Sequence, residues 1–210
     1  MADDKQNRRP KNEKTGTNVN LQENEGLPNF VTPIIPKMSI EDLPKEESNN
    51  LHKILAQVKK YQKPILKRTS TGLKMVLLFV GSNGTGKTLV AEALATTLGI
   101  SLFRVDLSAV VSKYVGETEK NLAKIFEAAE ESRSILFFDE VDALFGKHTE
   151  VRESHDRYAQ VDFDFLLQRL KSYQGLLILD TKKVDNLDPS LKKCFKMSMF
   201  CFQKKRDLRC

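Results

Sequence analysis

The chain has 210 residues, 40% of them hydrophobic, which is enough for one α/β domain with an appendage. It contains no run of 18 apolar residues and its start is polar and charged, so we expect no membrane-spanning helix, no signal peptide and a cytoplasmic protein. The net charge of +6 is concentrated in residues 181–210, where nine Lys/Arg accompany three Asp/Glu; such a run is more often a solvated surface than a nucleic-acid site.

Residues 1–50 are predicted to form a disordered or extended N-terminal tail or linker. Polar residues dominate there, and five of the seven prolines lie in this stretch. Such a composition buries too little apolar surface to offset the entropy that ordering costs. The apolar, proline-rich stretch at 27–36 is an exception, for which an extended linker is favoured over a segment that lies against the domain or a partner.

From residue 51 onward, predicted strands and helices alternate. The predicted helices cover 51–62, limited by Pro64; 87–98, ended by Gly99; a stretch capped by Thr118; and 161–173. The predicted strands cover 75–80, 100–106, 134–138, 176–179 and 197–202, with a loop or short helix at 110–116 and a polar loop at 146–156. This order predicts an α/β fold with three layers and a five-stranded, mostly parallel sheet, forming a core at 51–205 before a basic tail at 206–210.

A glycine-rich turn joins the strand at 75–80 to the helix at 87–98. Its residues fit the P-loop pattern and are Gly81, Ser82, Asn83, Gly84, Thr85, Gly86, Lys87 and Thr88, followed by Leu89. Glycines let successive N–H groups point at phosphate oxygens, and the helix adds its unpaired N-terminal donors. A chance match is the alternative, but the strand before the turn and the helix after it favour a site for ATP. Lys87 would contact the β- and γ-phosphates, and the Thr88 hydroxyl would ligate Mg²⁺.

A pair of carboxylates, Asp139 and Glu140, follows the apolar strand at 134–138 and resembles the Walker B motif. Asp139 would act on the Mg²⁺ shell, and Glu140 would be the general base that polarises the attacking water. The alternative is an ordinary strand followed by an acidic turn. One strand–helix unit separates this pair from the P-loop, and that context favours the functional interpretation.

With these motifs the chain resembles the AAA family of ATPases over about residues 40–205. The resemblance rests on the P-loop, on residues 112–122 (SKYVGETEKNL), on residues 136–145 (LFFDEVDALF) and on residues 186–189 (NLDP). It implies an ATPase that remodels or translocates protein substrates in a hexameric ring. By the same resemblance Lys113, Tyr114 and Val115 form a pore loop that grips a polypeptide, the alternative being an ordinary surface loop. The stretch at 146–161 looks like that of AAA ATPases encoded with phage-tail-like contractile injection systems.

The chain departs from the family pattern at three places. Asp180, Thr181 and Lys182 stand where the family has Ala-Thr-Asn, whose Asn senses the nucleotide. The region of Lys193 and Cys194 stands where the family has an arginine pair that reaches a neighbouring subunit. The helical lid that follows the last strand is expected to be absent. A hydrolysis-deficient ATP-binding scaffold or regulatory subunit is therefore the second hypothesis, and a basic nucleic-acid-binding ATPase the third.

Overall fold

The structure is a computed structural model that describes residues 29, 31–35, 37–65, 75–110, 114, 116–142, 154–194 and 197–203. The strands are β1 (Val31–Ile34), β2 (Met75–Val80), β3 (Leu102–Asp106), β4 (Ile135–Asp139), β5 (Leu176–Thr181) and β6 (Met197–Cys201). The helices are α1 (Lys45–Ile65), α2 (Lys87–Leu98), α3 (Leu107–Val110), α4 (Glu117–Ser132), α6 (Ser154–Ser172) and α7 (Pro189–Cys194), with 3₁₀ turns η2 (Ile40–Asp42) and η3 (Val184–Asn186).

The strands form a single sheet in the order β1-β3-β4-β5-β2-β6. All the pairings from β3 to β6 are parallel, which confirms the predicted α/β fold. The sheet has six strands rather than the predicted five, because β1 pairs antiparallel with β3 at one edge. This strand comes from the apolar stretch for which an extended linker was favoured. Val31 is buried in it, and Pro33 is tolerated because an edge strand leaves one row of N–H groups unpaired.

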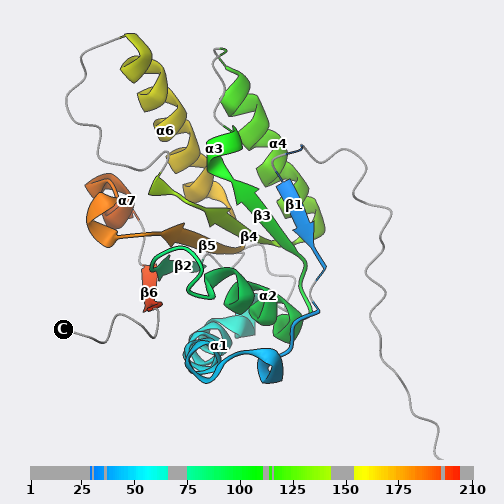
Figure 1. The fold of residues 1–210 in the computed structure, drawn as a ribbon. Coiled ribbons are helices and arrows are strands. Elements are labelled where there is room, and N and C mark those ends of the chain that lie inside the picture. Colours follow the sequence, from blue (N-terminus) through cyan, green and yellow to red (C-terminus); the bar gives the residue numbers. More distant parts are fainter. Residues whose placement is uncertain are drawn as a thin grey trace, which may run out of the picture.

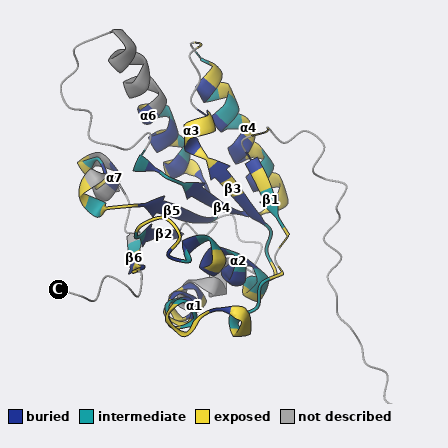
Figure 2. Cartoon of the chain, viewed as in Figure 1, coloured by how far each residue is buried: buried dark blue, intermediate teal, exposed yellow. Residues whose placement is uncertain are grey.

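Helices cover both faces of the sheet, which gives the three layers (Figure 1). Side chains alternate along β2: Leu77 and Phe79 pack with the apolar residues of α1 and α2, whereas Val76 and Leu78 pack with those of α4 and α6. Figure 2 shows the result, with buried residues along the strands and exposed residues on the outer faces of the helices. Within the described residues, no helix is both long and apolar enough to cross a bilayer.

Several element boundaries differ from the prediction. Helix α1 begins at Lys45 instead of residue 51, and Pro64 lies within its last turn. The N-cap of α4 is Gly116, and Thr118 lies buried in the first turn instead of capping it. Helix α6 starts at Ser154, inside the stretch predicted as a loop. The prediction for Gly99 is confirmed, since it ends α2 in the left-handed conformation.

Strand β5 also runs further than predicted, through Asp180 to Thr181. These two residues therefore belong to the sheet and lie beside β2, in register with Phe79 and Val80. Because parallel strands present their carboxyl ends at one edge, the last residues of β5 lie beside the P-loop and the end of β4. The longer strand thus adds a wall to the site described next.

Candidate active site

The carboxyl ends of β2, β4 and β5 meet around a cavity of about 400 Å³. Its lining comprises Asn83, Gly84, Gly86, Lys87, Thr88, Leu89, Arg104, Asp106, Asp139, Glu140 and Asp180. The structure thus brings the predicted P-loop residues and the predicted carboxylate pair together in one cavity. Gly81, Ser82 and Thr85 belong to the same loop, where the Thr85 hydroxyl donates to the Ser82 carbonyl at 2.9 Å.

Two glycines of the P-loop occupy positions that a side chain would not fit. At Gly81 a Cβ atom would lie 2.3 Å from the carbonyl oxygen of Phe202, which follows β6. At Gly86 the φ angle is +85°, and a Cβ atom would lie 2.8 Å from Cγ of Glu47 on α1. Gly86 is the N-cap of α2 and offers no side-chain hydrogen bond, so the helix keeps its N-terminal N–H groups for a ligand.

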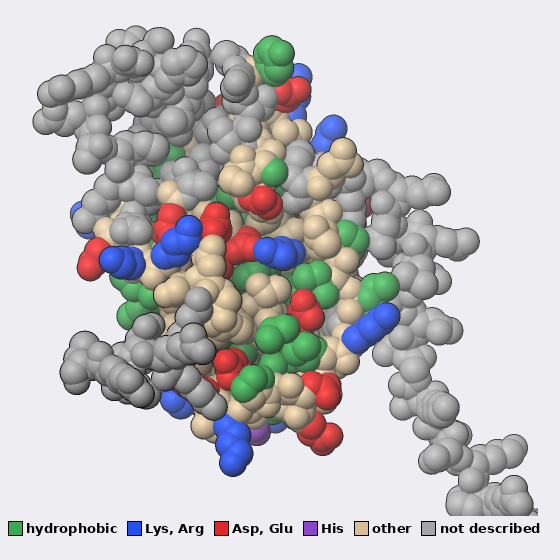
Figure 3. Space-filling model, in the orientation of Figure 1, with side chains coloured by type: hydrophobic (Ala, Val, Ile, Leu, Met, Phe, Trp, Pro, Cys, Tyr) green, Lys and Arg blue, Asp and Glu red, His purple; other side chains and the backbone are tan. Residues whose placement is uncertain are grey.

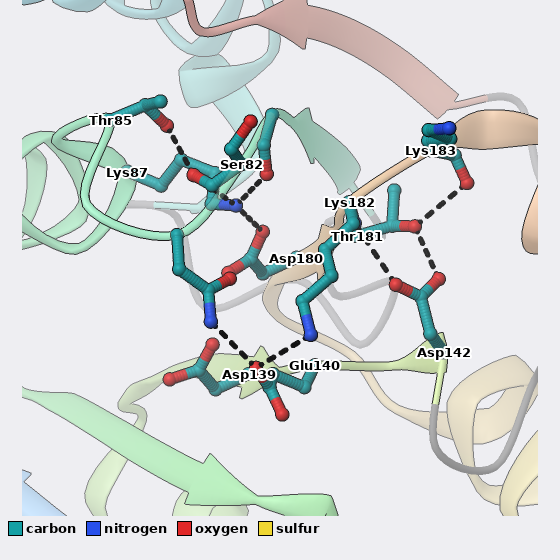
Figure 4. A network of polar contacts seen from close by, with 12 residues as sticks. Ser82, Thr85, Lys87, Asp139, Glu140, Asp142, Asp180, Thr181, Lys182 and Lys183 are labelled. Atoms are coloured by element: carbon teal, nitrogen blue, oxygen red, sulfur yellow. Dashed lines mark hydrogen bonds and ion pairs between the residues drawn. The ribbon is translucent and has the colours of Figure 1, made fainter. Parts of the chain in front are cut away.

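Lys87 is buried, and its ammonium group contacts three oxygens (Figure 4). It donates to the carbonyl of Gly81 and, at 3.3 Å, to that of Ser82. Its third contact is an ion pair with Oδ1 of Asp180 at 2.8 Å. The lysine that was predicted to bind phosphate is therefore held against its own loop and against β5.

Asp139, the predicted Mg²⁺ ligand, is paired with Arg104 of β3. The Arg104 Nε donates to Oδ2 of Asp139 at 3.0 Å, and the guanidinium forms an ion pair with the same oxygen. Burial by itself raises the pKa of Asp139, but its contacts with the Asp180 carboxyl group and with Arg104 outweigh that effect and leave the pKa below its usual value. Sequence reasoning missed Arg104; its only signal was a basic residue near the end of a strand that precedes the carboxylates.

Glu140, the predicted general base, has a φ angle of 52°, which is uncommon for a residue other than glycine. Its carboxylate accepts a hydrogen bond from Nδ2 of Asn83 at 3.0 Å and forms an ion pair with Nζ of Lys182 at 3.2 Å. The hydrogen bond from Asn83, followed by the contacts with Lys182, lowers the pKa of Glu140. Glu140 is therefore ionised at neutral pH, as a base must be, but its basicity is reduced.

Asp180 is buried between Lys87 and Asp139, and the sequence interpretation gave it no role beyond a departure from the family pattern. Burial raises its pKa to about 7, and the contact with the Lys87 ammonium offsets only part of that effect. Its Oδ1 accepts no hydrogen bond of good geometry from any described residue, although Lys87 is close. A buried carboxylate with an unsatisfied oxygen is costly and therefore marks a functional candidate.

Asp142 fixes the end of β5 next to this group. Its Oδ1 accepts a hydrogen bond from the Thr181 hydroxyl at 2.5 Å, and its Oδ2 accepts one from the Lys182 backbone N–H at 3.0 Å. The backbone N–H of Val141 also donates to the Asp180 carbonyl at 2.9 Å. These bonds join the turn after β4 to the end of β5, so the two walls of the cavity are held as one unit.

The residues predicted to hold Mg²⁺ suit that ion. The Thr88 hydroxyl and the Asp139 carboxylate line the same cavity, and both are hard oxygen donors. The part of the chain that the structure describes holds no cluster of three His, Cys, Asp or Glu residues placed to bind a metal. Thr88 and Asp139 supply two such donors, which suits Mg²⁺ because this ion takes one or two protein oxygens and completes its shell with phosphates and water.

Other predicted residues lie away from the cavity. Tyr114 has 77% of its surface exposed, while its neighbours Lys113 and Val115 lie outside the described residues. Lys193 is exposed on α7, but the side chain of Cys194 is not described. On the face drawn in Figure 3, acidic and basic side chains lie intermixed rather than in a patch of one sign.

Comparison with known proteins agrees with this geometry. The profile of the "ATPase family associated with various cellular activities (AAA)" matches residues 77–202, which include the P-loop, both carboxylates and the end of β5. The chain belongs to this family. That membership confirms the resemblance inferred from the motifs.

Individual AAA relatives include proteasome ATPases and an uncharacterised protein. The chain is 33% identical to the probable 26S proteasome regulatory subunit 10B of Caenorhabditis elegans, over 79% of the chain and 44% of that relative. It is 34% identical to the uncharacterised AAA family ATPase y4kL of Sinorhizobium fredii, over 80% and 49%. It is 32% identical to the proteasome-activating nucleotidase of Methanothermobacter thermautotrophicus, over 79% and 44%. The chain thus spans about half the length of these relatives.

Proposed function

We propose that this AAA chain binds ATP with Mg²⁺ and hydrolyses it to remodel or translocate protein substrates. One observation carries the proposal: the P-loop side chains of Lys87 and Thr88 line the same cavity as Asp139 and Glu140. A phosphate-binding loop, a carboxylate for the cation and a base for water are the parts that phosphoryl transfer to water requires. Because such catalysis depends mainly on position and charge, their convergence in one cavity is the relevant evidence.

Each residue has a defined task in this mechanism. Lys87 exchanges contacts with its own loop for contacts with phosphate oxygens, and the N-terminal N–H groups of α2 stabilise the same charge. Bound Mg²⁺, held by Thr88 and Asp139, would neutralise charge on the phosphates. Glu140 accepts a hydrogen bond from the attacking water and draws its proton away, while Asn83 keeps the carboxylate at the cavity wall.

Action in a ring on a polypeptide is the finer part of the proposal. Two of the relatives described above are named as a proteasome regulatory subunit and a proteasome-activating nucleotidase, which supports a protein substrate and an oligomeric ring for this chain, with a cytoplasmic location as part of the proposal. The exposure of Tyr114 suits a residue that grips a passing chain. Among the coloured residues of the face drawn in Figure 3, acidic and basic side chains are intermixed, without a basic patch of the kind that nucleic-acid binding uses.

A second function is supported by the ion pair between Lys182 and Glu140. A lysine cannot accept a hydrogen bond from water, so it does not replace the asparagine that the resemblance implies at this position. A chain whose base is held by this lysine would bind ATP and turn it over slowly, as a scaffold or regulatory subunit of a ring.

Steady-state ATPase activity at several protein concentrations, with and without Mg²⁺, tests these functions. We expect Mg²⁺-dependent turnover that falls about 10²–10⁴-fold in Glu140→Gln, which is the usual contribution of a general base. Glu131→Gln is the matched control, because Glu131 is an exposed carboxylate of α4 that does not line the cavity. Turnover per chain that rises with concentration would support a ring.

The outcomes separate the two functions. Turnover that Glu140→Gln abolishes supports the ATPase. Mg²⁺-dependent binding of ATP with wild-type turnover no higher than the protein-free background, at any concentration, supports the scaffold instead. Turnover that is well above this background and equal in the wild type and Glu140→Gln would overturn the assignment of Glu140 as the base.

A further inference from the structure

The Lys87–Asp180 pair is the most deeply buried ion pair of the described residues. The side chains have 5% and 7% of their surface exposed, against 51% and 41% for Lys182 and Glu140. Water therefore screens the Lys87–Asp180 attraction little, and breaking the pair leaves a charge without solvent. The same burial places the Asp180 carboxylate at the floor of the cavity that we assign to nucleotide phosphates.

The ammonium group of Lys87 is already surrounded by oxygens of its own chain. It has three N–H groups, and it contacts three oxygens, those of Gly81, Ser82 and Asp180. A phosphate oxygen gains a bond to Lys87 only when one of these contacts is given up. Asp180 is the one anion among the three, so it resembles a phosphate oxygen most closely in charge.

No other described cation is placed to release Lys87 by pairing with Asp180 in its stead. Lys182 lies two residues along the chain, but its ammonium contacts Glu140, and Arg104 contacts Asp139. Oδ1 of Asp180 accepts no well-formed hydrogen bond among the described residues either. The negative charge of the carboxylate is therefore neutralised by Lys87 alone among the described cations. The carboxylate competes with any anion that approaches the same ammonium group.

We propose that Asp180 is a positioning residue that competes with nucleotide phosphate for Lys87 and thereby weakens nucleotide binding. This inference rests on the proposed function, since it names an internal competitor within the nucleotide site. It goes further because it predicts that removal of the negative charge of Asp180 tightens nucleotide binding at this site. Because Mg²⁺ neutralises phosphate charge, the competition is stronger for the nucleotide alone than for its Mg²⁺ complex.

The test is the dissociation constant of ADP for the full chain, measured by calorimetry in EDTA and again in Mg²⁺. We expect Asp180→Asn to bind ADP about ten- to a hundredfold more tightly in EDTA, the range for one charge-assisted hydrogen bond regained. The gain should be smaller in Mg²⁺. Asp106→Asn is the matched control, because Asp106 lines the cavity but its carboxylate accepts from the Ser108 N–H and hydroxyl instead of Lys87.

A second pair of variants, Lys87→Met and Lys87→Met with Asp180→Asn, separates competition for Lys87 from general repulsion. The substitution Asp180→Asn should increase the affinity for ADP only slightly when Lys87 is absent. An equal gain in both backgrounds, an equal gain from Asp106→Asn, or no gain in a folded Asp180→Asn would each overturn the inference. If Asp180→Asn does not fold, Asp180→Ala is measured in the same way.

These outcomes are distinct from a failure of the proposed function. ADP binding by the wild type that Lys87→Met weakens supports the nucleotide site, whatever the substitution at 180 does. Failure of both the wild type and a folded Asp180→Asn to bind ADP, or ADP binding that is equally tight without Lys87, overturns both the proposed function and the competition.

Discussion

The two walls of the cavity differ in how they relate to the family. One wall, formed by the P-loop and the end of β4, carries the residues that phosphate and Mg²⁺ require. The other wall, the end of β5, presents Asp180 and Lys182, where the resemblance to the family implies Ala and Asn. Each of these two residues pairs with a group of opposite charge on the first wall (Figure 4). The β5 wall thus neutralises the charges of Lys87 and Glu140 on the P-loop wall.

Burial separates the two pairs in strength. The Lys182–Glu140 pair is exposed, and pairs of that kind are worth about 0–1 kcal/mol. The Lys87–Asp180 pair is buried, and loss of one partner from such a pair costs about 3–5 kcal/mol. The β5 wall therefore restrains Glu140 weakly and Lys87 strongly, so we expect it to affect nucleotide binding more than the chemical step.

Loss of Lys87 should produce the largest effect. We expect Lys87→Ala to weaken ATP binding by about a hundredfold or more, because the lysine would make two charge-assisted bonds to phosphates at about 1.5–3 kcal/mol each. Titration with ATP in Mg²⁺ measures this. Lys183→Ala removes a charge from an exposed position after β5 and serves as the control. Equal affinity in Lys87→Ala and wild type would mean that the P-loop wall does not bind phosphate.

Most of the fold could be predicted because its signals are local. The strand at Met75–Val80 and the helix at Lys87–Leu98 have the predicted bounds, since a continuous apolar run, a glycine turn and a glycine C-cap specify them. Strand β1 could not be assigned in the same way. Of its four residues only Val31 is buried, and the strand depends on pairing with β3, which joins segments about 70 residues apart.

The P-loop wall was predictable for the same reason, and the β5 wall was not. The spacing within residues 81–88 fixes which groups approach phosphate, because the loop acts through its own backbone. Asp180 and Arg104 gain their roles only from register, which places them beside the P-loop and Asp139. The sequence showed that residue 182 departs from the family, but the partner of Lys182 depends on the turn that places Glu140 at a positive φ.

Restoring the family's residue at 182 should have a moderate effect that sharpens the comparison. We expect Lys182→Asn to raise ATP turnover about two- to fivefold, because an exposed pair of up to about 1 kcal/mol no longer restrains Glu140. An amide can also accept a hydrogen bond from water, which an ammonium cannot. The turnover number and the Michaelis constant are measured together, and only the former should change. Lys183→Asn should change neither; an equal rise there would trace the effect to net charge.

The smallest effect on the cavity should come from Tyr173, which lies beyond the opposite end of the sheet. Its buried hydroxyl donates to the Ser134 carbonyl at 2.7 Å, just before β4, so it secures the start of β4 next to that of β5. Tyr173→Phe leaves that carbonyl unpaired and should lower the free energy of unfolding by about 1–3 kcal/mol. The affinity for ADP should stay at the wild-type value, because the lost hydrogen bond lies at the starts of β4 and β5, whereas the cavity lies at their ends.

Alkaline pH gives a further readout of Tyr173. Burial raises the pKa of its hydroxyl above the usual value of 10, so the unfolded chain loses this proton at a lower pH than the folded chain. The wild type should therefore lose stability as the pH rises above about 10, by up to about 1.4 kcal/mol per pH unit from this one group. Below that pH the group is protonated in both states and contributes no slope. Urea unfolding at about pH 8 and about pH 11 measures the loss, which should be smaller in Tyr173→Phe. An equal alkaline loss in both proteins would show that Tyr173 ionises as freely in the folded chain as in the unfolded one.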